Sequence, residues 1–313
     1  MEPLKSPTTG WKSWTAKKKA LLLTSILLFI IALAVGLGVG LGLGLKNDDD
    51  NDNNNGDNTG ENPPNTTGIW QPAVGSTWQI VLRYALNDTS PEVAVYDIDL
   101  FDNDRAVIDD LHSSGRRVIC YFSAGTYEDW RDDARQFPSN DLGDALDDWE
   151  GENWVDTRSS AVRDIMRARL DLAVEKGCDG VDPDNVDAYD NSNGLGLGED
   201  DAVDYVNFLA REARERRLAI GLKNAGAIIP SVLTRMQWSV NEQCAQYDEC
   251  DVYAAFVRAG KPVFHIEYPK GEETNDAVEV TGVRKAQACD FEDADEFSTV
   301  IKNMDLDNWV QTC

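Results

Sequence analysis

Residues 160–185 read SAVRDIMRARLDLAVEKGCDGVDPDN, a helical pattern followed at once by a short strand pattern. Within Ser160–Lys176, apolar side chains recur at the three- and four-residue spacing of a helix with one buried face. They are Val162, Ile165, Met166, Leu170 and Ala173. The next run, Cys178–Asp182, has the length and composition of a buried strand. A helix that leads directly into such a strand is typical of a parallel α/β fold.

The same alternation extends along the chain in both directions. A second helical pattern covers Asp201–Arg217. Further strand patterns, rich in Val, Ile, Tyr and Phe, lie at Trp78–Tyr84, Val93–Leu100, Arg117–Ser123, Leu218–Lys223, Met236–Asn241 and Pro262–Tyr268, with a weaker one at Phe297–Ile301. Eight strands would close a (β/α)8 TIM-like barrel, and a doubly wound open sheet is the alternative.

Nearly all of these strand patterns end in polar or ionisable side chains, and the C-terminal ends of barrel strands are where active sites form. The residues at or just past these ends are Asp97, Asp99, Tyr121, Tyr127, Asp182, Asp184, Asn185, Lys223, Asn224, Asn241, Glu242, Glu267 and Tyr268. Each alone has an ordinary structural explanation; the run 182–185, for instance, has the composition of an Asx turn. Their joint placement favours an active site.

Carboxylates are the reactive groups that this candidate site holds in excess. A Ser-His-Asp triad has little support, since His112 precedes the third strand and His265 lies mid-strand. The Gly-rich run 194–198 lacks the Lys-Ser/Thr of a phosphate-binding loop. Two carboxylates that flank a bond, one as acid and one as base or nucleophile, perform glycoside hydrolysis.

The overall charge is strongly acidic, with 56 Asp and Glu against 29 Lys and Arg and a formal net charge of -27. Phosphate would be repelled, so we predict no nucleic-acid partner. The charge suits a cationic partner, or simply a solvated surface.

The N-terminus predicts a membrane anchor. Lys17–Lys19 precede an uncharged apolar stretch at residues 20–45, long enough to span a bilayer as a helix. Residues 1–19 would then form a cytoplasmic tail, residues 46–68 (rich in Asn, Asp, Gly and Pro) a disordered stalk, and residues 69–313 an extracellular catalytic domain. This is a single-pass type II topology in the cell membrane, with a cleaved signal peptide as the alternative.

The cysteines and two acceptor sequences fit an extracellular domain. N-glycosylation acceptor sequences begin at Asn65 and Asn87. An even number of Cys, six, suggests disulfides. Cys244 with Cys250 is the best local pair, Cys289 with Cys313 would pin the C-terminus, and Cys120 and Cys178 either pair or remain buried thiols. Without a C-x-x-C spacing and with two His, we predict no metal site and no cofactor.

Several long motifs, in order along the chain, resemble glycoside hydrolase family 114, and within it the membrane-anchored fungal endo-α-1,4-galactosaminidases. These motifs are VICYFSAGTYEDWR (118–131), WVDTR (154–158), GCDGVDPDNVD (177–187), GLKN (221–224), NEQC (241–244) and VFHIEY (263–268). Together they cover nearly all of Trp70–Cys313. The resemblance implies a (β/α)8 barrel that cleaves α-1,4-linked galactosamine inside the polymer galactosaminogalactan, and we favour a retaining mechanism.

The resemblance maps the catalytic pair onto Asp184, as nucleophile, and Glu242, as acid/base. Alternate strand residues face the same way, so Asp182 can enter the site as well and its role stays open. The substrate would be a polycation, because deacetylated galactosamine carries an amine. Carboxylates to pair with amines would be Asp97, Asp99, Asp182, Asp187 and Glu267, rings to stack on sugars would be Tyr121, Tyr127, Trp154 and Tyr268, and further substrate-binding groups would be Asn185, Lys223, Asn224 and Asn241. A non-catalytic sugar-binding or adhesion protein on the same barrel is the alternative.

Overall fold

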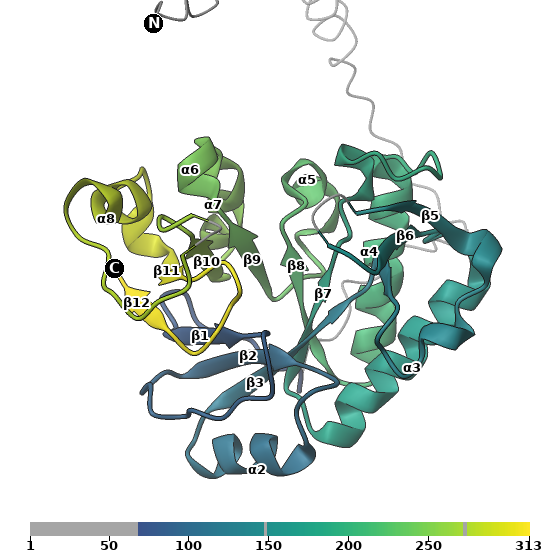
Figure 1. Cartoon of the computed structure of the whole chain (residues 1–313), viewed down its shortest axis with the longest axis horizontal. Helices are drawn as coiled ribbons and strands as arrows, with labels where there is room; N and C mark the ends of the chain where they lie inside the picture. Colours follow the sequence, from purple (N-terminus) through teal and green to yellow (C-terminus); the bar gives the residue numbers. More distant parts are fainter. Residues whose placement is uncertain (1–67, 147–148, 272–273) are drawn as a thin grey trace, which may run out of the picture. The chain divides into compact units, whose positions relative to one another are not determined.

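A computed structural model describes residues 68–146, 149–271 and 274–313. Within these ranges, eight parallel strands lie side by side in chain order (Figure 1). They are β1 (Trp78–Val81), β2 (Val95–Asp99), β3 (Arg117–Ser123), β7 (Gly180–Asp184), β8 (Ala219–Lys223), β9 (Trp238–Glu242), β10 (Val263–Glu267) and β11 (Ser298–Lys302), followed by the antiparallel β12 (Val310–Thr312). Eight parallel strands in sequential order are the arrangement of a (β/α)8 barrel, which confirms the predicted α/β barrel class.

The first and last parallel strands are joined by side chains. The Trp78 indole Nε1 on β1 donates a hydrogen bond of 2.7 Å to the Ser298 carbonyl on β11. Lys302 Nζ donates one of 2.9 Å to Gln79 Oε1. These contacts bring the two edges of the sheet together and exclude the open-sheet alternative.

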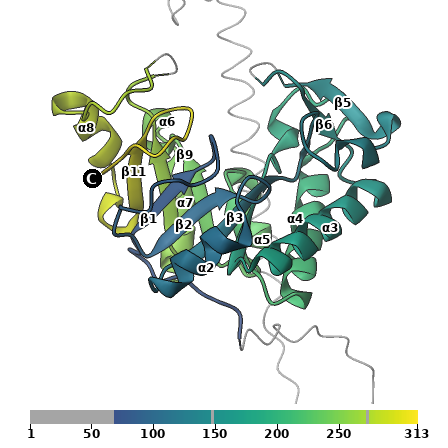
Figure 2. The same cartoon turned by 60° about the horizontal axis from the view of Figure 1, so that its bottom comes forward.

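Helices cover the outer face of the strands. In the described part of the chain, the α-helices are α2 (Arg105–Ser113), α3 (Ser160–Lys176), α4 (Glu199–Glu215), α5 (Ile229–Val232), α6 (Cys244–Tyr247), α7 (Cys250–Arg258) and α8 (Gly282–Cys289). Short 3₁₀ turns are η2 (Ala134–Gln136), η3 (Ser139–Asp141), η4 (Ala188–Asp190), η5 (Gly226–Ile228) and η6 (Ala294–Glu296). Figure 2 shows α3 and α4 packed side by side outside the sheet.

Helix α3 has the bounds that its sequence predicts. The Ser159 side chain accepts a hydrogen bond from the Ala161 backbone N–H at the start. Gly177 ends the helix at φ 90°, a left-handed conformation that glycine adopts without steric cost. The other prediction, Asp201–Arg217, is two residues late at each end, because α4 begins after Gly198 with three acidic residues in its first turn.

Apolar side chains form one layer on each face of the sheet. Outward-facing strand residues such as Ile98, Phe122 and Leu222 pack against the helices. The inward-facing layer fills the barrel with Trp78, Ile80, Val95, Ile119, Ala219, Trp238, Val240, Phe264, Ile266, Tyr268 and Val300.

Two inward-facing glycines make space for Trp238. A Cβ on Gly221 would lie 2.0 Å from Trp238 Nε1, and a Cβ on Gly180 would lie 2.6 Å from its Cη2. Both distances are far shorter than van der Waals contact. Gly180 and Gly221 therefore let one large ring fill the centre of the barrel.

A small antiparallel sheet follows β3 and was not predicted. It consists of β4 (Thr126–Glu128), β5 (Leu142–Ala145) and β6 (Glu152–Val155), in the order β4-β6-β5. Its strands have three or four residues each, too few for an alternating pattern to show in the sequence.

The six cysteines form three disulfides: Cys120–Cys178, Cys244–Cys250 and Cys289–Cys313. The two expected pairs are confirmed, and the open question about Cys120 and Cys178 is settled in favour of a disulfide between β3 and the residue two before β7.

The predicted tail (1–19), membrane anchor (20–45) and all of the predicted stalk except Gly68 lie outside the described residues. Among the residues that are described, no helix has the length and apolar composition to cross a bilayer. Asn87, one of the two predicted glycosylation acceptors, is exposed.

Candidate active site

Asp184 and Glu242 meet across Lys223 at the C-terminal ends of three neighbouring strands. Asp184 ends β7, Lys223 ends β8 and Glu242 ends β9. Lys223 Nζ lies 2.9 Å from Asp184 Oδ2 and 3.1 Å from Glu242 Oε2. The structure thus brings together the two carboxylates that the sequence singles out, with one ammonium between them.

Other side chains orient each carboxylate. Tyr121 donates its hydroxyl to Asp184 Oδ2 over 3.1 Å. Tyr268 donates to Glu242 Oε1 over 2.5 Å, and Asn224 Nδ2 donates to Glu242 Oε2 over 3.1 Å. The Glu242 backbone N–H donates in turn to Asn224 Oδ1 over 2.9 Å. Together with Lys223, these three residues from the predicted set hold the pair in place.

The electrostatics keep Glu242 ionised. Burial alone would raise the pKa of Glu242, but Lys223, Tyr268 and Asn224 together hold it below its usual range. Lys223 is buried too, and burial would lower its pKa, yet the carboxylates of Asp184, Glu242 and Asp182 raise it well above the ordinary value. The cluster is thus a charged network in which Lys223 stays protonated.

The backbone just beyond these strand ends is strained. Asn185, Asn224, Ala225 and Gln243 all have positive φ, between 46° and 62°. Such conformations cost energy for residues with a Cβ and concentrate at functional sites. Gly125 permits one of them, because a Cβ there would lie 1.5 Å from the Asn185 carbonyl oxygen.

Asn185 is anchored by a chain of hydroxyls. Its Nδ2 donates to Ser123 Oγ over 2.9 Å and to Thr126 Oγ1 over 3.2 Å, and Thr126 donates to Glu152 Oε2 over 2.8 Å. The Asn185 backbone N–H donates to Asp184 Oδ1 over 2.7 Å. Asn185 therefore acts here by fixing Asp184 and the small sheet.

Asp97 and Asp182 lie deeper in the barrel than the catalytic candidates. Both are 0% exposed, so neither presents surface to a sugar amine in this structure. Burial and the neighbouring Asp182 raise the pKa of Asp97 well above its usual value. The pKa of Asp182 is raised to about 7, by burial first and then by Asp184, against the opposing effect of Lys223.

Asp99 and Glu267 have other partners in the structure. Asp99 Oδ2 lies 2.6 Å from Arg131 Nη2, an arginine that the sequence analysis did not single out. Glu267 Oε1 lies 2.9 Å from His265 Nε2 and accepts a hydrogen bond of 2.8 Å from the Ala245 backbone N–H. We therefore do not place Asp99 or Glu267 among the groups that contact a sugar. Asn241 is likewise almost fully buried.

A pocket beside Asn185 offers aromatic and acidic surface. It has a volume of about 600 Å³ and is lined by Asp144, Ala145, Leu146, Trp149, Trp154, Asn185, Asp187, Asp190, Asn191 and Ser192. Burial and the nearby Asp184 raise the pKa of Asp187 to about 6. Trp154, Asn185 and Asp187 were predicted because they lie in motifs that resemble the family, whereas Asp144 and Trp149 lie outside those motifs. Tyr127 instead packs edge-on against Phe137.

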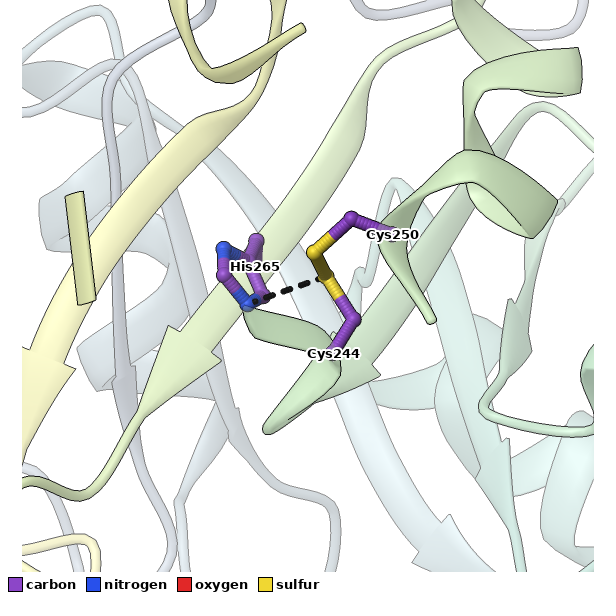
Figure 3. A group of neighbouring side chains, drawn as sticks. All are labelled: Cys244, Cys250 and His265. Atoms are coloured by element: carbon purple, nitrogen blue, oxygen red, sulfur yellow. Dashed lines mark hydrogen bonds between the residues drawn. A yellow bond between two sulfur atoms is a disulfide. The ribbon is translucent and has the colours of Figure 1, made fainter. Parts of the chain in front are cut away.

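Figure 3 shows the disulfide Cys244–Cys250 beside the His265 ring, with Cys244 Sγ 3.3 Å from His265 Nε2. Metal-ligating atoms of these three residues lie within 4.8 Å of one another. A metal ligates thiolates, however, and both sulfurs are committed to the disulfide. In this form the cluster pins the start of α6, immediately after Glu242, against β10.

The sequence of residues 59–313 matches the model of glycoside-hydrolase family GH114. The chain belongs to glycoside-hydrolase family GH114. This confirms the predicted family and agrees with a carboxylate pair at the C-terminal end of the strands.

A crystal structure of Aspergillus fumigatus Ega3 in complex with galactosamine is 63% identical in sequence, covers 78% of this chain and 97% of its own, and has a TM-score of 0.77. The glycoside hydrolase domain of PelA from Pseudomonas aeruginosa shares the fold, with 12% identity, 75% and 98% coverage and a TM-score of 0.55. An uncharacterized protein of Deinococcus radiodurans is 29% identical over 50% of this chain, and the match spans 57% of that relative's length.

Proposed function

We propose that the chain is an endo-acting glycoside hydrolase that cleaves α-1,4-linked galactosamine in galactosaminogalactan, with Asp184 as nucleophile and Glu242 as acid/base. The observation that carries this proposal is the bridge from Asp184 through Lys223 to Glu242. It places two carboxylates around one point, on the strands β7 and β9 that flank β8, and glycosidic bond cleavage requires such a pair.

The proposed steps follow from the contacts of each carboxylate. In the fraction of the protein in which Glu242 carries a proton, Asp184 attacks the anomeric carbon while Glu242 protonates the leaving oxygen. Glu242 then takes a proton from the water that releases the sugar from Asp184. Lys223 and Tyr121 hold Asp184 in position for attack, and Tyr268 and Asn224 hold Glu242.

The separation of the pair supports a retaining mechanism. Asp184 Oδ2 lies 2.9 Å and Glu242 Oε2 lies 3.1 Å from the same Lys223 Nζ. These two oxygens are therefore no more than about 6 Å apart. Retaining enzymes hold their carboxyls at roughly 5–5.5 Å, while inverting enzymes need roughly 6.5–9.5 Å to admit a water.

Galactosamine as the substrate unit is supported by two observations. Ega3, 63% identical, was crystallised with galactosamine. The pocket beside Asn185 combines two tryptophan rings with Asp144, Asp187 and Asp190. Rings stack on sugar faces and carboxylates attract amines, so this lining suits an amino sugar better than a neutral one.

The N-terminal segment suggests where the enzyme acts. We propose a type II protein of the cell membrane with residues 69–313 outside the cell, on the basis of Lys17–Lys19 and the apolar stretch 20–45. An extracellular position would give the enzyme access to a secreted polysaccharide and would suit the three disulfides.

The proposal is tested by incubating the protein with partly deacetylated galactosaminogalactan and reading products by mass spectrometry and NMR. We expect oligosaccharides of several lengths, with the α-anomer formed first. Release of monosaccharide alone would argue for an exo-acting enzyme, and a first-formed β-anomer would argue for inversion. Binding without cleavage would identify a non-catalytic sugar-binding or adhesion protein.

A further inference from the structure

Two buried carboxyl groups below the catalytic pair have no visible hydrogen-bond donor. Asp97 on β2 and Asp182 on β7 are both 0% exposed. Within the described residues, no N–H or O–H group donates to any of their four oxygens. A buried carboxylate with no donor is very costly, and two side by side would also repel each other. Asp97 and Asp182 are therefore not both ionised in the folded protein.

The two groups are close neighbours. Strands β2 and β7 both pair with β3, with Asp97 level with Ile119 and Asp182 level with Tyr121. Both face the barrel interior from the two strands that flank β3, and a hydrogen bond between the two carboxyls would satisfy oxygens that have no other donor among the described residues. Such a bond needs a proton on one partner, since two carboxylates have only acceptors.

The charged groups around the pair are those of the active site. Asp97 faces Asp182, Lys223 and Asp184. Asp182 faces Lys223, Asp184 and Glu242 in addition to Asp97. Lys223 is the cation near both Asp97 and Asp182, and it is also the group that bridges the catalytic candidates.

We propose that Asp97 and Asp182 share one proton, with Asp97 as the neutral donor, and that the pair positions Lys223 between Asp184 and Glu242. Above the Asp182 pKa of about 7, Asp182 supplies a carboxylate below Lys223, and Asp97 holds that carboxylate in one orientation. Neither residue touches the sugar, so both are positioning residues. The role in catalysis rests on the proposed hydrolysis, whereas the shared proton does not.

The shared proton has a consequence for stability that needs no substrate. The raised pKa of both groups means that the folded protein binds more protons than the unfolded chain above about pH 4. Stability from this source is fully present below that pH and is lost as the pH rises through the folded-state pKa values. Asp97→Asn keeps a donor of the same shape and removes one buried acid, so it should flatten this loss.

The first arm of the test measures Tm of the full-length protein between about pH 5 and about pH 8. As the pH rises over this range, we expect the Tm of Asp97→Asn to fall less than the Tm of wild type. Asp99→Asn is the matched control: it lies on the same strand and is equally buried, but its carboxylate is paired with Arg131. It should lower Tm at every pH in the range. If the Tm of Asp97→Asn fell with pH as much as the Tm of wild type, or more, the shared proton would be overturned.

The second arm measures kcat and KM on the polymer at about pH 5 and about pH 8. Asp97→Ala, which cannot donate, should lower kcat at least about 10-fold with KM nearly unchanged, and Asp97→Asn should restore it to within about 3-fold of wild type. Equal loss in the Ala and Asn variants, or a change confined to KM, would overturn the positioning role. If wild type cleaves nothing, the hydrolase proposal fails while the Tm arm still decides whether the proton is shared.

Discussion

The ammonium of Lys223 lies 3.1 Å from Glu242 Oε2, and it is a principal reason why the pKa of Glu242 is held below its usual range despite burial. A carboxyl with a lowered pKa is well suited to act as a base. It can act as an acid only while it is protonated, so we expect activity to be greatest at acidic pH and to decline as pH rises.

Substitution of Lys223 tests this relationship. Lys223→Met removes the charge that stabilises ionised Glu242, so the pKa of Glu242 should rise and the alkaline decline in kcat should move to higher pH. Because Asp184 also loses its partner, kcat should fall on the order of 10²-fold. The measurement is the pH profile of kcat on the polymer. A decline at the same pH as in wild type would show that Lys223 does not set the protonation of Glu242.

Trp149 is expected to bind sugar. It is 58% exposed and lines the pocket beside Asn185. Trp149→Ala should raise KM several-fold, since loss of one stacking contact costs about 1 kcal/mol, with kcat little changed. Trp130→Ala is the matched control, because Trp130 is similarly exposed, at 52%, and is not part of the pocket lining. Equal effects of the two substitutions would remove the pocket from the substrate path.

Salt should weaken activity on the deacetylated polymer. The chain carries a net charge of -27, and salt screens the attraction between this charge and sugar amines. On the deacetylated polymer, we expect kcat/KM to fall as the NaCl concentration rises from about 0.02 M to about 0.5 M. On fully acetylated polymer, if its cleavage is measurable, kcat/KM should change much less over the same range. Independence from salt on the deacetylated polymer would count against recognition of a polycation.

Two disulfides should have separable effects. Cys289–Cys313 spans 24 residues and its loss should cost about 3.5 kcal/mol of unfolding free energy, against about 2 kcal/mol for Cys244–Cys250, which spans 6. Cys244–Cys250, however, holds α6 next to Glu242. Replacing that pair with Ser should reduce kcat, while the Ser variant of Cys289–Cys313 should mainly lower Tm. The reverse pattern would show that the short disulfide does not support the site.

Much of the barrel could be predicted because its elements are decided locally. Ser159 and Gly177 mark both ends of α3 in the sequence. Strand β7 was placed two residues early because Pro183 usually interrupts a strand, yet here it lies within one. The small sheet escaped prediction because its strands pair residues up to 28 apart in three- or four-residue runs.

The sequence predicted which residues lie at the candidate site, but not which of them are buried or paired with other side chains. Alternation along the strand predicted that Asp182 and Asp184 face the same way, and the strand-end position singled out Asp97. Neither pattern could show that Asp97 and Asp182 are buried below Asp184. The sequence also could not show that Asp99 is engaged by Arg131, since that pairing depends on the loop after β4. The catalytic roles of Asp184 and Glu242 remain predictions.

The most direct test of those roles compares polymer cleavage by wild type, Asp184→Asn and Glu242→Gln. Each substitution keeps the size of the side chain, and Tm measurements would establish that all three proteins are folded. We predict that wild type shortens partly deacetylated galactosaminogalactan and that each variant is slower by at least about 10³-fold. A folded variant of either residue that cleaves at the wild-type rate would contradict the assignment of the catalytic pair.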